Sequence, residues 1–172
     1  MAKRTILTAP DPRLKAVGKD VEKVDAGIRQ LADDMLETMY AADGVGLAAI
    51  QIGVALNVVV IDVAQKEGKN EPQVFINPKI VWASDVLARY EEGCLSVPDI
   101  WEEVERPVAI RAEYLDLKGE KQTLEAEGFL ADCMQREIDH LKGTLFIDHL
   151  SRLKRAMALK KLAKAKKLME MA

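Results

Sequence analysis

The stretch of residues 129–141 reads FLADCMQREIDHL, and its pattern sets the centre of the predicted fold. Its apolar residues recur at intervals of three or four, which places them on one face of a helix; they are Leu130, Met134, Ile138 and Leu141. Gly143 lies just beyond and can end the helix. The sequence therefore predicts a helix over residues 129–141 with one buried face.

A second helical pattern lies on the N-terminal side of this stretch. Asp25 can cap a helix that should end near Asp43. Its apolar positions recur with helical spacing; they are Ile28, Leu31, Met35 and Met39. The sequence therefore predicts a helix near the N-terminus as well as the central one.

Strand-like segments separate the two helices. Valine- and isoleucine-rich runs predict strands; these runs are residues 57–63, 74–76, 79–83 and 108–117. Residues 66–72 predict a turn or loop, residues 118–120 a hairpin turn before a strand at 122–127, and residues 144–147 a further strand. We expect an α+β fold, with antiparallel sheets packed around the central helix and a helix near each terminus.

Length and composition favour one globular domain. The chain has 172 residues, of which 49% are hydrophobic and 31% are charged, so we expect a single domain over residues 1–172. No stretch predicts a membrane span or a signal peptide. The two cysteines, Cys94 and Cys133, are too few for a disulfide framework. These features predict a cytoplasmic protein.

The last 22 residues differ from the rest of the chain in charge. Residues 151–172 predict an amphipathic helix that carries eight basic residues and one acid, whereas the whole chain has a formal net charge of −3. The bases are Arg152, Lys154, Arg155, Lys160, Lys161, Lys164, Lys166 and Lys167. Either this is a solvated helix face or it attracts phosphates. The overall charge argues against sequence-specific nucleic-acid binding.

Three short segments combine glycine with residues able to do chemistry. Residues 44–51 read GVGLAAIQ, which predicts either a ligand-binding loop or a closely packed turn. Residues 91–98 read EEGCLSVP, in which Cys94 is either a ligand or nucleophile or a small buried hydrophobe. Residues 135–140 read QREIDH, in which Glu137 and His140 form either part of a metal site or a surface arrangement.

Together and in this order, the three segments resemble the motifs of the peptide deformylase family, G-x-G-x-A-A-x-Q, E-G-C-L-S and Q-H-E-x-D-H. The likeness extends to residues 10–14, 75–78 and 141–150 and covers the whole chain. The resemblance implies removal of the formyl group from the formyl-methionine of nascent polypeptides, with release of formate.

The resemblance also implies a role for each matching residue. Cys94 and His140 match metal ligands, and the family's metal is ferrous iron, with zinc, nickel or cobalt as substitutes. Glu137 matches the general base and acid, and the Gln51 amide and the Leu95 N–H match donors to the formyl oxygen. The residues that match the peptide and methionine subsites are Gly44, Val45, Gly46, Tyr90, Gly93 and Phe129. The basic tail resembles a helix that contacts ribosomal RNA.

One position departs from the family pattern. Arg136 stands where the family has its first histidine ligand, and a guanidinium stays protonated and offers no lone pair to a metal. Neither His149 nor Cys133 is placed to replace the lost ligand; we expect an end-of-strand histidine and a packing cysteine. The sequence thus leaves two hypotheses, a deformylase with impaired turnover and a metal-free relative that binds chain ends or a partner. We also expect Arg136 to lie near Cys94 and Glu137 and to favour the Cys94 thiolate.

Overall fold

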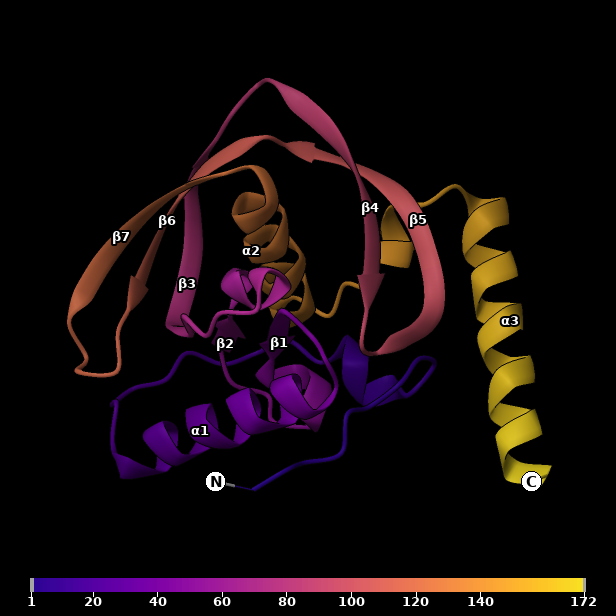
Figure 1. Cartoon of the computed structure of the whole chain (residues 1–172), viewed down its shortest axis with the longest axis horizontal. Helices are drawn as coiled ribbons and strands as arrows, with labels where there is room; N and C mark the ends of the chain where they lie inside the picture. Colours follow the sequence, from indigo (N-terminus) through magenta and orange to yellow (C-terminus); the bar gives the residue numbers. More distant parts are fainter. Residues whose placement is uncertain (1, 172) are drawn as a thin grey trace.

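The computed structural model describes residues 2–171, in which one helix lies between two antiparallel sheets (Figure 1). This central helix is α2 (Gly128–Leu141). The five-stranded sheet has the order β1 (Gly46–Ala48), β2 (Val58–Ile61), β3 (Gln73–Ala83), β6 (Ala109–Leu115) and β7 (Lys121–Glu127). The second sheet pairs β4 (Leu87–Cys94) with β5 (Val97–Pro107). The predicted α+β fold is confirmed.

The two predicted helices before the basic tail form as the apolar spacing indicated. Helix α1 (Ala26–Ala41) begins at Asp25, whose carboxylate accepts a hydrogen bond from the Ile28 N–H at 3.0 Å. Its buried face packs on β1 and β2. The buried face of α2 meets Phe75 and Val59 from the opposite side of the same sheet. Because β2 is covered on both faces, all four of its residues are buried, as a continuous apolar run predicts.

Several predicted boundaries were wrong. Residues 74–76 and 79–83 form one strand, β3, with a bulge in its pairing to β6. Residues 63–67, expected partly as strand and partly as loop, form the 3-10 helix η3 (Val63–Glu67). Residues 144–147 do not form a strand; the Asp148 carboxylate accepts from the Leu145 N–H at 2.9 Å, and the 3-10 helix η4 (Phe146–His149) follows. His149 therefore ends a short helix rather than a strand.

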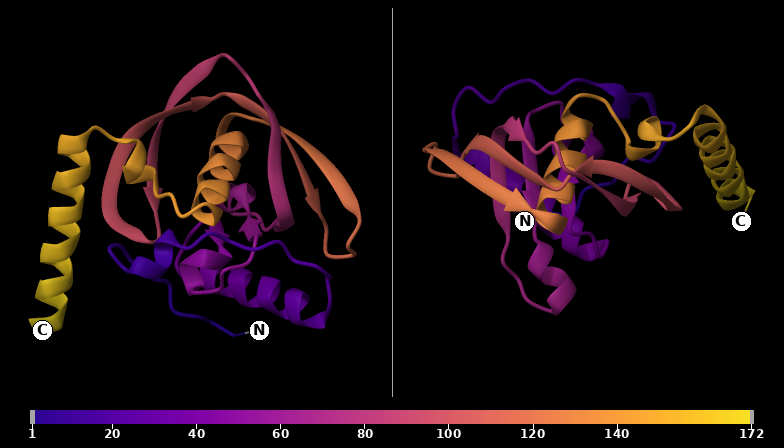
Figure 2. Two further views of the ribbon diagram at one scale, coloured as in Figure 1. Left: turned by 180° about the vertical axis from the view of Figure 1, so that it is seen from behind. Right: turned by 90° about the horizontal axis from the view of Figure 1, so that it is seen from above.

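The basic tail forms helix α3 (Arg152–Met171), which runs along the edge of the molecule beside β5 (Figures 1 and 2). It packs through Ala158 and Leu162 on the buried side of β5, and most of its other side chains are exposed. No helix among residues 2–171 is long and apolar enough to cross a membrane.

The N-terminal segment is tied to three parts of the molecule by backbone hydrogen bonds. The Leu7 N–H donates to the Gln51 carbonyl at 2.7 Å, in the 3-10 helix η2 (Ala49–Ile52). The Ala9 N–H donates to the Ser96 carbonyl at 2.8 Å, in the turn between β4 and β5. The Gly18 N–H donates to the carbonyl of Leu141 at the end of α2. This segment, with its short helix η1 (Pro12–Lys15), therefore joins the elements that carry all three motifs.

Candidate active site

A cavity of about 410 Å³ opens where the three motifs meet. The residues before and in β1 form one wall, the end of β4 and the start of β5 form another, and α2 contributes the third. Most of the residues singled out in the sequence line it: Gly44, Val45, Gly46, Gly93, Cys94, Leu95, Phe129, Arg136 and Glu137. Tyr90, Gln51 and His140 are not among its lining residues, although Gln51 and His140 contact Cys94.

The Cys94 thiol and the His140 ring lie in direct contact. Cys94 Sγ is 3.2 Å from His140 Nε2, and the Ser96 N–H donates to the same sulfur at 3.4 Å. The His140 ring is buried, and its Nδ1 has no hydrogen-bond partner. Burial lowers the pKa of His140 to about 4, so the ring is neutral at ordinary pH. The fold thus brings together the two ligand types that the sequence indicated.

Gln51 is fixed beside this pair. Its side-chain oxygen accepts from the Ala48 N–H at 2.9 Å. Its amide nitrogen donates to Ser96 Oγ at 3.0 Å and lies 3.4 Å from Cys94 Sγ. The side chain is almost fully buried, so these contacts hold its orientation beside Cys94.

Glu137 presents a carboxyl group with unused hydrogen-bonding capacity. Its Oε2 is buried without a partner, and a Cβ atom on Gly46 would lie 3.1 Å from its Cγ. The glycine therefore lets β1 approach the carboxyl group closely. Burial raises the pKa of Glu137 to about 7. A carboxyl group with that pKa can both take up and release a proton near neutral pH.

Two further glycines make room inside the cavity. A Cβ atom on Gly44 would lie 2.6 Å from Leu95 Cδ1, and one on Gly93 would lie 2.5 Å from the Trp101 ring. Both distances are too short for a side chain unless its neighbour moved. These glycines therefore serve close packing between the motifs, whichever ligand the cavity takes.

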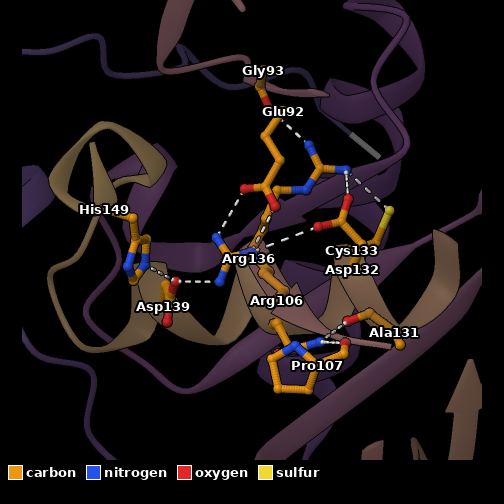
Figure 3. Close-up of polar contacts among 11 residues, drawn as sticks. Glu92, Gly93, Arg106, Pro107, Ala131, Asp132, Cys133, Arg136, Asp139 and His149 are labelled. Carbon is orange, nitrogen blue, oxygen red and sulfur yellow. Dashed lines mark hydrogen bonds and ion pairs between the residues drawn. The ribbon is translucent and has the colours of Figure 1, made fainter. Parts of the chain in front are cut away.

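The Arg136 guanidinium is built into the cavity wall (Figure 3). Its Nη1 donates to the Gly93 carbonyl at 2.8 Å, and its Nη2 lies 3.3 Å from both Asp132 Oδ2 and Cys133 Sγ. It therefore joins the end of β4 to the preceding turn of α2. Cys133 otherwise packs in the core and also lines the cavity.

The expected effect of Arg136 on Cys94 was wrong. Arg136 pairs with Asp132 and the Gly93 carbonyl rather than with Cys94 or Glu137. Loss of hydration and the Glu137 charge raise the pKa of Cys94 to about 12, against a smaller opposing effect of Arg136. Without another ligand on the sulfur, Cys94 is therefore a thiol and not a thiolate.

A network of buried charges continues from Arg136 to the surface (Figure 3). Arg106 on β5 donates to both oxygens of Glu92, at 2.6 and 2.8 Å, and to Asp139 Oδ2 at 2.9 Å. It also lies 3.6 Å from Asp132, and His149 Nε2 is 2.8 Å from Asp139 Oδ2. Arg106 and Asp132 were missed in the sequence. The sequence could have pointed to Asp132, because an acid four residues before Arg136 lies on the same helix face and can form an ion pair with it.

The donors at this site do not fit the metal that the resemblance implies. Cys94 and His140 offer two ligands, and the third position holds a cation that cannot donate a lone pair. Within residues 2–171 no three histidine, cysteine or acidic side chains are placed to hold an ion. We therefore derive no chemical step through a metal for this chain.

Comparison with known proteins gives a consistent result. The polypeptide deformylase family model matches residues 3–156. The chain is 58% identical to a peptide deformylase of Phenylobacterium zucineum, over 95% of this chain and 97% of that protein. It is 55% identical to one of Rhizobium meliloti, over 97% of this chain and 96% of that protein.

Solved structures extend the likeness to three dimensions. A peptide deformylase from Legionella pneumophila has a TM-score of 0.93 at 46% identity, covering 99% of each chain. One from Ehrlichia chaffeensis in complex with actinonin has a TM-score of 0.91 at 46% identity, covering 96% of this chain and 98% of that one. In each comparison the likeness thus spans nearly the full length of both chains.

Proposed function

Because this chain belongs to the peptide deformylase family, we propose that its cavity binds the formyl-methionine end of nascent polypeptides and that Arg136 impairs removal of the formyl group. The family consists of metal-dependent hydrolases. The observation that carries the proposal is the position of the Arg136 guanidinium, held between the Gly93 carbonyl and Asp132.

The cavity keeps features that suit the end of a peptide. Val45 and Phe129 supply apolar lining for a methionine side chain, and the glycines at 44, 46 and 93 allow a peptide backbone to approach. Tyr90 lies outside the lining residues, so we leave it out of the proposed methionine pocket. These features support binding independently of catalysis.

The chemistry left to this chain's own residues is proton transfer. Glu137 can take a proton from a water molecule and pass it to the leaving amine. What is missing is a strong electrophile beside it. A cation about 5 Å from a divalent ion would oppose metal binding by several kcal/mol at an effective dielectric near 20, before the lost ligand is counted. We therefore expect slow hydrolysis.

The decisive experiment measures metal content and formate release together. The wild-type chain should purify without stoichiometric metal, and Arg136→His should bind about one equivalent and release formate from a formyl-methionyl peptide on the order of 10³-fold faster. Arg111→His changes an exposed arginine and serves as the control. Stoichiometric metal in the wild-type chain, with turnover equal to that of Arg136→His, would contradict the proposal.

A second candidate function is binding without hydrolysis. It is favoured by Asp132, a buried acid 3.3 Å from the arginine, because Arg136 then has a partner within the protein itself. This function predicts that a formyl-methionyl peptide binds equally well with and without chelator. Failure of Arg136→His to gain either metal or turnover would favour it over the first candidate.

We further propose that α3 contacts ribosomal RNA phosphates and that the protein acts in the cytoplasm, where nascent chains are made. The support is the basic, largely exposed surface of α3. Here residues 1–172 act as one deformylase-like domain with residues 151–172 as its basic appendage. Truncation after Leu150 should weaken co-sedimentation with ribosomes at low salt, and unchanged co-sedimentation would remove this part of the proposal.

A further inference from the structure

A fully buried acid outside the cavity has no basic partner. Asp62 directly follows β2 and is completely buried. It forms no ion pair in the part of the chain that the structure describes. Its Oδ1 is buried without a hydrogen-bond partner. Because a buried carboxylate is costly unless it is paired or hydrogen-bonded, Asp62 depends on the contacts of its other oxygen, Oδ2.

Two groups donate hydrogen bonds to Asp62 Oδ2. One is the hydroxyl of Tyr40, in the last turn of α1. The other is the Glu71 backbone N–H, at 2.9 Å. Burial and the hydrogen bond to Asp62 raise the pKa of Tyr40, so this hydroxyl keeps its proton and donates it. The carboxylate therefore joins α1 to both ends of the segment 62–71, which contains η3.

This segment contributes to the wall of the cavity. Lys66 of η3 lines the cavity and lies over the Phe129 ring, 3.8 Å from its centroid. Phe129 is a lining residue as well. The Asp62 N–H donates to the carbonyl of Val45, a third lining residue, at 2.8 Å. Asp62 is thus connected to the wall in two ways, through its own N–H and through Lys66.

We propose that Tyr40 and Asp62 are positioning residues, which hold Lys66 over Phe129 and thereby shape the wall that receives the methionine side chain. Residues 66–71 are exposed, so little buried surface holds this half of the segment in place. The Asp62 carboxylate supplies the missing attachment at Glu71. This inference rests on the proposed function, since it gives the Lys66–Phe129 contact a role in peptide binding.

The first test is amide hydrogen exchange at Glu71, followed by NMR without any peptide. Tyr40→Phe keeps the ring but removes one of the two donors to Asp62. A hydrogen bond to a charged group is strong enough that its loss should make the Glu71 N–H exchange about tenfold faster. Tyr114→Phe is the matched control, because the Tyr114 ring packs against Phe75 and lies outside the cavity lining. It should leave this exchange rate unchanged.

The second test is a double-mutant cycle on binding of a formyl-methionyl peptide. Tyr40→Phe and Lys66→Ala should each raise the dissociation constant about threefold to tenfold. The double variant should bind no more weakly than Lys66→Ala, because both changes act through the same contact with Phe129. A loss of stability without a positioning role would instead give additive effects. Tyr114→Phe should bind the peptide as the wild-type chain does.

The outcomes separate this inference from the function beneath it. Unchanged exchange at Glu71 in Tyr40→Phe would show that Tyr40 does not hold the segment. Additive losses in the double variant, or wild-type affinity in Tyr40→Phe, would overturn the positioning role and leave the proposed function standing. If even the wild-type chain bound no peptide, the proposed function would fall, and the positioning role with it.

Discussion

Two adjacent stripes of α2 differ in whether their side chains form ion pairs. Residues 133, 137 and 140 form one stripe, in which Glu137 Oε2 and His140 Nδ1 are buried without a partner. Residues 132, 136 and 139 form the other, in which every side chain makes an ion pair, although Asp132 Oδ1 and Arg136 Nε are also buried without a hydrogen-bond partner. The first stripe leaves the Glu137 carboxyl group free for proton transfer, and the second attaches α2 to β4 and β5. Arg136 therefore belongs to the second stripe, whose contacts stabilise the fold.

The largest effect on this contrast is expected from removing Arg106, the arginine on β5 that contacts two residues of the paired stripe. Arg106→Leu leaves the buried Glu92 and the half-buried Asp139 without the cation that they share. Breaking one partner of a buried ion pair costs about 3–5 kcal/mol. We expect a loss of that size in the free energy of unfolding, measured by urea denaturation. A loss below 1 kcal/mol would mean that the network adds little to stability.

The stripe without ion pairs, residues 133, 137 and 140, should instead affect how the free energy of unfolding depends on pH. The pKa of Glu137 is raised from 4.5 to about 7 on folding, so between these values the folded state keeps a proton that the unfolded state has lost. Stability therefore falls as pH rises through this window, by roughly 3 kcal/mol for this group. Glu137→Gln should lack this slope in urea denaturation at pH 4.5–7.5. Parallel curves for the two proteins would disprove the shift.

A double-mutant cycle tests whether Arg136 truly belongs to the paired stripe. Asp132→Asn, Arg136→Met and the double variant should give a coupling free energy of about 1–3 kcal/mol, because the two side chains are in contact and buried. Urea denaturation of the four proteins supplies the value. Coupling near zero would show that Asp132 does not hold the arginine.

The smallest effect is expected where a similar pair lies at the surface. Arg111 and Glu125 are 3.0 Å apart, but both are largely exposed. Arg111→Ala should change the free energy of unfolding by about 0–1 kcal/mol. The Arg111 contact is nearly as short as those of Arg106, so only burial distinguishes the two arginines here. If Arg111→Ala lowered the free energy of unfolding as much as Arg106→Leu, burial would not explain the stability that Arg106 provides.

The sequence predicted what depends on local spacing. Helix α1 could be placed from the Asp25 cap and its apolar positions, and residues of all three motifs line one cavity. The β4–β5 hairpin was missed, because its strands carry exposed charges and one buried acid, Glu92. Glu92 is neutralised by an arginine 14 residues away, and no local pattern reveals such a pair. The raised pKa of Cys94 escaped prediction for the same reason, since it depends on burial by distant segments.

The backbone bonds of the N-terminal segment have a practical consequence for labelling. Leu7 and Ala9 hold the backbone of η2 and of the β4–β5 turn, which carry Gln51 and Ser96. A fluorophore or affinity tag placed ahead of these residues would be attached to the segment that makes these bonds. The final turn of α3 lies apart from α2 and β1 in Figure 1, so a C-terminal tag is the safer choice for binding measurements.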